Sequence, residues 1–285
     1  MEARHLLAGF SFFFSAFALS DSRLGFGGVD NARRNAASRL SSVLLSSSFM
    51  ELDTNMEEPL FPMLVWGDLN REQIEERAKL DRLISSAYRE VDSFRSAIAL
   101  ADHSFSGISE LSNKLRNTIE NQTSKQIMAQ MRVVNMWPVM AAHSAINSLY
   151  HFSDVLDGLA QWADGSSFTR HFANPDKPFT PATILFESNF PKWKQTRHAV
   201  AHKGEITRKM GANLHKAPIN KGSLKKAKGA TALIQDFFDD RTFITTRRGE
   251  LLRFDVTAEN YEKLLSVYKL VIQCAQPKNE QRPKD

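Results

Sequence analysis

The chain has 285 residues, of which 42% are hydrophobic and 24% charged, a composition typical of globular proteins that hold one large domain or two modest ones. Its formal net charge of +5 at pH 7 mildly favours an anionic partner. The single cysteine, Cys274, excludes an intrachain disulfide and a cysteine-rich metal site, and its apolar surroundings predict a buried, unreactive side chain.

Residues 1–63 differ in composition from the rest of the chain. Residues 6–19 form a phenylalanine-rich apolar run that ends in Ala-Phe-Ala, the outline of a secretory signal. A stable membrane span is not expected, because spanning a bilayer takes about 20 apolar residues. We favour a low-complexity segment outside the fold, which predicts a cytoplasmic protein, whereas a working signal would predict export. If the segment is instead upstream sequence, translation would start at Met50, Met56 or Met63.

Residues 64–276 carry the periodicity of a helical bundle, and residues 277–285 are expected to be a disordered tail. Asn70 and Gln73 are spaced as a capping box at the start of a long amphipathic helix. Residues 103–107 interrupt its pattern, so that a shorter helix is expected over residues 108–119. A third helix is expected from Thr123 to Val134.

The strongest helical pattern covers residues 139–162. Its polar stripe usually indicates a solvated face, although it could line a cleft opposite Arg197 and His202. The stripe consists of His143, Asn147, His151 and Asp154. Residues 164–180 are expected to form a loop and residues 182–187 a short helix.

After residue 204 the helical periodicity ends in a lysine-rich loop. Residues 242–246 and 251–256 flank Arg247-Arg248-Gly249-Glu250 and predict a β-hairpin. Thr257 is expected to cap a final amphipathic helix. The predicted fold is therefore mainly α, a helical bundle with a basic loop and a small β-hairpin inserted before the last helix.

The densest group of polar functional residues lies near the end of a helix expected between Pro191 and Gly204. It contains Arg197, His198 and His202. At about 100° per residue the two histidines share a face, whereas Arg197 and His202 lie roughly 140° apart.

Arg197-x4-His202, with the polar His198 directly after the arginine, resembles the R-x4-6-H signature of HEPN domains. These are all-α bundles of prokaryotic defence and toxin systems and of several RNA-processing enzymes. The resemblance covers residues 70–275 in helical architecture and residues 193–205 in motif. The basic loop and the hairpin depart from the minimal bundle of that family.

The resemblance implies a metal-independent endoribonuclease that acts as a homodimer, with two copies of the motif facing each other, in a defence or toxin–antitoxin system. RNA and an antitoxin protein would be its partners, and no cofactor or metal is expected. Arg197 and His202 would be catalytic, and His198 would orient or contact RNA. Histidine suits proton transfer near neutral pH, and the forked arginine suits phosphate oxygens. The basic residues expected to bind the RNA backbone are Lys203, Arg208, Lys209, Lys221, Lys225, Lys226 and Lys228.

Two alternatives stay open. In a non-catalytic HEPN-like interaction module, a histidine would stabilise the helix C-terminus and Arg197 would pair with an acidic residue of a neighbouring helix. In a metal site, His198-x3-His202 would supply two imidazole ligands on one face, and Glu205 follows them. The residues between the histidines lack the glutamate of metalloproteases, and the sequence identifies no third ligand. A solvent-open Arg197–His202 pair would favour catalysis, and a buried, ion-paired Arg197 would favour a scaffold.

Overall fold

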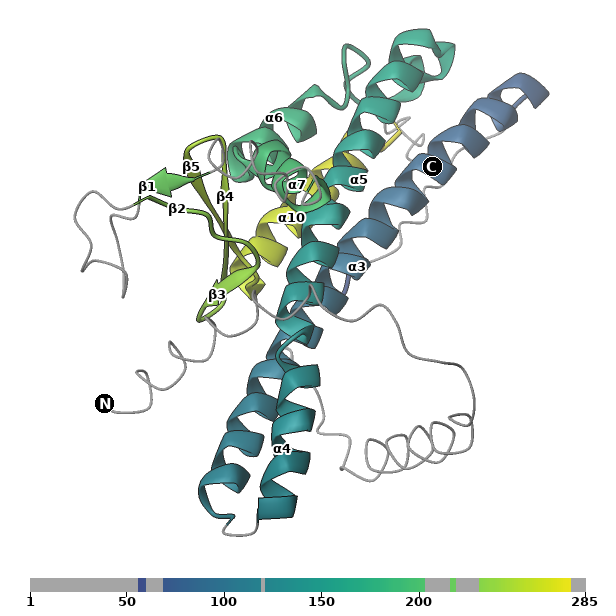
Figure 1. Cartoon of the computed structure of the whole chain (residues 1–285). Coiled ribbons are helices and arrows are strands. Elements are labelled where there is room, and N and C mark those ends of the chain that lie inside the picture. Colours follow the sequence, from purple (N-terminus) through teal and green to yellow (C-terminus); the bar gives the residue numbers. More distant parts are fainter. Residues whose placement is uncertain (1–55, 60–68, 119–120, 203–215, 219–230, 278–285) are drawn as a thin grey trace, which may run out of the picture. The chain divides into compact units, whose positions relative to one another are not determined.

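The computed structural model describes residues 56–59, 69–118, 121–202, 216–218 and 231–277 (Figure 1). Contacts divide the chain into Met1–Asn55 and Met56–Asp285, and every described residue belongs to the second unit. This unit is mainly helical with a small antiparallel sheet, which confirms the predicted fold class at that level. None of its described helices is long and apolar enough to cross a membrane.

The longest helix, α3 (Arg71–Arg116), runs for 46 residues. Its predicted capping box is confirmed, since the Asn70 side chain accepts from the Gln73 N–H and the Gln73 side chain accepts from the Asn70 N–H, each at 2.9 Å. These two bonds satisfy backbone donors that the first helical turn leaves open.

The predicted break at residues 103–107 is wrong, because α3 is continuous there. Two of the residues that suggested a break face α4 (Asn121–Val134) instead. The buried Ser104 hydroxyl donates to the Val134 carbonyl at 2.8 Å, and a Cβ on Gly107 would meet Val134 Cγ1 at 3.4 Å. These residues therefore lie against a neighbouring helix and do not mark a chain reversal.

The core forms where α3 lies along α5 (Trp137–Gly165), with α10 (Ala258–Cys274) against α3 (Figure 1). Both long helices bury a continuous apolar face, which is the main stabilising contribution at about 1.5 to 3 kcal/mol for each fully buried large side chain. The fully buried residues of this interface include Leu80, Ile84, Phe94, Leu149, Phe152 and Leu159.

The predicted loop at residues 164–180 contains a 3-10 helix, η2 (Ser167–His171). Phe168, Phe172 and Phe179 are buried and contact Trp162 of α5, so aromatic packing orders a segment whose local sequence is rich in loop residues. Helix α6 (Thr180–Asn189) follows.

Helix α7 (Trp193–Ala201) is shorter than the helix expected between Pro191 and Gly204. Pro191 and Lys192 form a turn, and His202 is the C-terminal cap residue, outside the helix.

The predicted hairpin is confirmed by β4 (Thr242–Arg247) and β5 (Glu250–Asp255). Arg248 and Gly249 both have positive φ angles, of 48° and 79°, as a two-residue hairpin turn of the primed type requires. The sequence did not indicate β3 (Phe237–Asp239), which pairs with β4, or the short pair β1 (Ala217–Pro218) and β2 (Thr231–Ala232).

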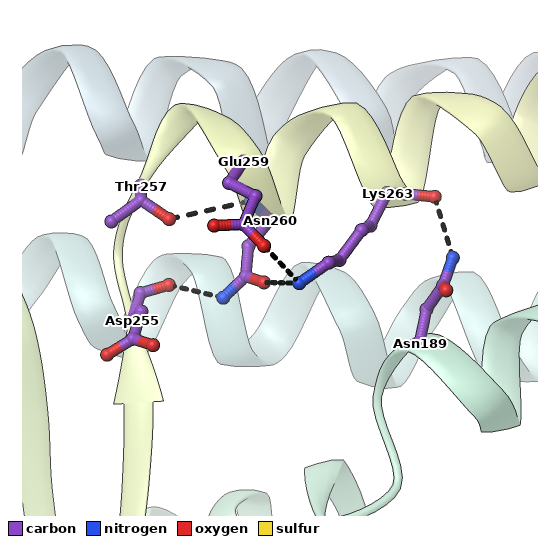
Figure 2. Close-up of polar contacts among 6 residues, drawn as sticks. All are labelled: Asn189, Asp255, Thr257, Glu259, Asn260 and Lys263. Carbon is purple, nitrogen blue, oxygen red and sulfur yellow. Dashed lines mark hydrogen bonds and ion pairs between the residues drawn. The ribbon is translucent and has the colours of Figure 1, made fainter.

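Figure 2 shows how α10 starts. The predicted cap, Thr257, accepts from the Asn260 N–H at 3.5 Å, and Asn260 Nδ2 donates to the Asp255 carbonyl at 2.7 Å. One turn later, Asn189 at the end of α6 donates to the Lys263 carbonyl at 3.2 Å. The start of α10 is thus tied both to β5 and to the helix that precedes the motif.

Residues 56–59, which the sequence assigned to the N-terminal segment, contact the bundle. Met56 is buried, Glu58 pairs with Arg95 at 3.0 Å, and Glu57 pairs with Lys269 at 2.6 Å. At the other end, Pro277 forms an isolated bridge with Phe172, and the rest of the predicted tail lies outside the described residues.

Candidate functional site

Helix α7 is held by one buried face. Trp193, Thr196 and Ala199 recur at three-residue spacing and are all nearly inaccessible. The Trp193 ring lies 6.2 Å from the Tyr150 ring of α5 and 5.8 Å from the Phe186 ring of α6. This packing fixes the face of α7 that turns toward α5 and leaves Gln195 and His198 exposed.

Arg197 is half-buried and turns toward α5. Its Cζ atom lies 4.2 Å from the centroid of the Tyr150 ring, well within the range of a cation–π contact. Its Nε is buried without a hydrogen-bond partner, and no carboxylate of the described residues forms an ion pair with the guanidinium. Arg197 is therefore neither fully open to solvent nor ion-paired within the part of the chain that the structure describes.

His198 and His202 are exposed, and their rings stack with centroids 5.7 Å apart at 24°. His202 has left the helix, with φ −106° and ψ 30°, and its N–H donates to the His198 carbonyl at 3.1 Å. The structure thus brings the two imidazoles together, whereas the guanidinium contacts a ring of α5. The guanidinium and the imidazoles of the motif therefore have different neighbours.

Two hollows in the described surface lie away from the motif. One, of about 630 Å³, lies between the end of α3 and the start of α4 and is lined by polar residues such as Glu110, Lys114 and Gln126. The other, of about 580 Å³, is lined by α6 residues including Thr180 and Ile184. Neither includes a motif residue.

The polar stripe of α5 divides into two parts. His143 pairs with Asp236 at 3.1 Å and packs edge-on against Phe243, which joins α5 to the sheet. Asn147, His151 and Asp154 are exposed, as a solvated face predicts.

Close to the motif, the His151 ring lies 5.1 Å from that of Tyr150. His151 also acts on Glu90 of α3. Burial raises the pKa of the Glu90 carboxyl, and the charges of His151 and Arg89 partly oppose that rise. Tyr150 therefore contacts His151 of its own helix and Arg197 of α7.

The predicted RNA-binding residues lie outside the described residues, and among the lysines of the basic loop only Lys216 is described, as an exposed side chain. Within the described residues, no group of three or more His, Cys, Asp or Glu side chains could hold a metal ion. Glu205, which follows the two histidines of the metal interpretation, also lies outside them. Cys274 is half-buried, and burial raises the pKa of its thiol.

Tyr150 is the residue of this site that the sequence did not single out. A signal was present, since it adjoins His151 in the polar stripe rather than falling on the apolar face of its helix. Its contact with Arg197, however, joins residues far apart in the chain and follows only from the packing of α7 on α5.

No protein-family model, curated protein or solved structure matches this chain.

Proposed function

We propose that this chain is a metal-independent endoribonuclease of the HEPN type. The observation that carries the proposal is that Arg197 lies on an aromatic ring, without an acidic partner among the described residues, and that the same short segment, α7 and its cap residue, carries two stacked and exposed imidazoles. This is the set of groups that RNA cleavage without a metal requires: a fixed cation for the phosphate and imidazoles to move protons.

In the proposed reaction the ribose 2′-oxygen attacks the adjacent phosphorus atom, and the bond from phosphorus to the 5′-oxygen breaks. His202 takes the proton of the 2′-hydroxyl, and the leaving 5′-oxygen takes a proton from a second imidazole in its protonated form, for which His198 is the nearest source. Proton transfer of this kind contributes about 10²–10⁴-fold to the rate. The products are a 2′,3′-cyclic phosphate and a 5′-hydroxyl.

Arg197 would steady the phosphate oxygens as negative charge builds up on them. Because its guanidinium lies toward α5 while the imidazoles lie on the exposed side, we propose that the working site is formed across a homodimer, with Arg197 of one protomer acting on a phosphate held at the imidazoles of the other. RNA in the cytoplasm is the proposed substrate, and an antitoxin protein is the proposed partner if the chain belongs to a toxin–antitoxin system.

The decisive experiment uses the purified full chain, a single-stranded RNA and excess EDTA. His202→Ala and Arg197→Ala should abolish cleavage while leaving the helical content unchanged. Gln195→Ala, an exposed residue of the same helix, should cleave as the wild type does. Equal cleavage by His202→Ala and the wild type would refute the catalytic role, and products without a cyclic phosphate would refute the proposed chemistry.

Mixing the two inactive variants tests the dimer. Equal amounts of Arg197→Ala and His202→Ala should recover about one quarter of wild-type activity if each site combines residues of two protomers, because half of the dimers are mixed and each mixed dimer has one intact site. A site contained within one protomer would recover nothing.

A non-catalytic interaction module is the second candidate. Two observations favour it: the buried Nε of Arg197, which gives this side chain a packing role, and the position of His202 at a helix C-terminus, where a positive charge is stabilising. It predicts that Arg197→Ala lowers stability and that no variant of the motif changes the fate of RNA.

A further inference from the structure

We propose that Tyr150 is a positioning residue of this site. Its ring, and not its hydroxyl, holds the Arg197 guanidinium by one face so that the terminal N–H groups can bind a phosphate group of RNA. The inference rests on the proposed function and deepens it.

The ring that carries the guanidinium is itself held in place. Tyr150 is half-buried in the middle of α5 and contacts the Trp193 ring at 6.2 Å and the His151 ring at 5.1 Å. Trp193 is only 6% exposed and packs on α6 as well. A guanidinium 4.2 Å from the centroid of this ring is therefore held by a fixed surface rather than by another mobile side chain.

What the guanidinium can bind depends on whether a ring or a carboxylate holds it. A carboxylate partner would occupy the N–H fork and neutralise the charge, as carboxylates do at other arginines of this chain. Arg241 has such a pair with Asp102 in addition to lying over the Phe105 ring, and Arg95 pairs with Glu58 at 3.0 Å. Arg197 has the ring without a carboxylate among the described residues, so no described group neutralises its charge. Because its Nε is buried, an anion would have to bind the terminal N–H groups of the guanidinium.

The hydroxyl of Tyr150 forms no hydrogen bond with any described residue, so removing it should leave the ring in place. This separates the proposed role from a general structural one. Tyr150→Phe keeps the aromatic face, whereas Tyr150→Leu keeps a comparable apolar volume and removes that face.

The test measures single-turnover cleavage of a short single-stranded RNA by the full chain and, in parallel, binding of the same oligonucleotide made uncleavable with 2′-deoxy sugars. Tyr150→Phe should match the wild type within about twofold in both assays, whereas Tyr150→Leu should lose about 3- to 30-fold. In an Arg197→Ala background, Tyr150→Leu should cause no further loss. Phenylalanine carrying one, two or three ring fluorines at position 150 weakens the contact stepwise at nearly constant shape, and binding should fall in the same order.

An NMR signal reports the geometry independently of activity. The ring current of Tyr150 should shift the Nε–H resonance of Arg197 upfield, and the shift should persist in Tyr150→Phe and vanish in Tyr150→Leu. If the wild type binds RNA without cutting it, the ribonuclease proposal fails, while the dependence of binding on the ring still supports the inference. Unchanged binding in Tyr150→Leu, equal losses in Tyr150→Phe and Tyr150→Leu, no trend across the fluorinated series, or no RNA binding by the wild type would each overturn it.

Discussion

Gly107 offers a direct test of the continuous α3 helix. Glycine inside a helix is less favourable than alanine by about 1 kcal/mol. An added methyl group at Gly107 would meet Val134 Cγ1 at 3.4 Å, which is within ordinary van der Waals contact. Gly107→Ala should therefore stabilise the protein by about 0.5 to 1 kcal/mol, which corresponds to a rise in Tm of about 1 to 4 °C for a unit of this size.

Gly158 supplies the matched control. It lies inside α5, so its helix propensity gain is the same, but an added methyl group would meet Leu83 Cδ2 at 3.1 Å. The leucine must then shift, which offsets the gain, and Gly158→Ala should be neutral or destabilising. Urea unfolding followed by far-UV circular dichroism compares the two variants. A destabilised Gly107→Ala, or a Gly158→Ala variant that gains as much, would refute this account of how α3 passes α4 and α5.

Two further predictions concern other parts of the unit. Burial raises the pKa of Glu90 above its usual value of 4.5, so the folded state favours the neutral carboxyl. The contribution of the neutral carboxyl to the free energy of unfolding is therefore complete below pH 4.5 and is lost as the pH rises through the raised pKa. Glu90→Gln should thus raise the free energy of unfolding at pH 7, with a difference from the wild type that disappears below pH 4.5; a constant difference across a pH series of urea titrations would contradict this. Thr257→Ala should cost about 0.5 to 2 kcal/mol by removing the cap of α10, and Thr257→Ser should restore most of it, as thermal unfolding would show; equal losses in both would mean that the hydroxyl is not the cap.

The features that the sequence predicted correctly depend on local chemistry. The capping box of Asn70 and Gln73 and the cap at Thr257 each involve residues three apart, and the turn at Arg248 and Gly249 involves neighbours. Such signals are complete within one helical turn or one hairpin, so a single sequence contains all the information that they need.

The features that the sequence missed depend on contacts between distant segments. Ser104 and Gly107 suggested a break because their partner, Val134, lies on another helix. In the same way, His143 was grouped with a solvated stripe although it pairs with Asp236, 93 residues away. Polar and small residues on a helix are ambiguous until the neighbouring element is known, and periodicity does not identify that neighbour.

The same ambiguity applies to the two arginines that lie over aromatic rings. Arg241 and Arg197 are both close to rings of long helices, at 5.7 Å from Phe105 and 4.2 Å from Tyr150. Asp102 forms an ion pair with Arg241 and gives it a structural role, whereas no described carboxylate pairs with Arg197. Since a phosphate gains most from a guanidinium that does not first have to leave an ion pair, the difference between these two surroundings is a stronger reason than the R-x4-6-H spacing alone for proposing RNA chemistry at α7.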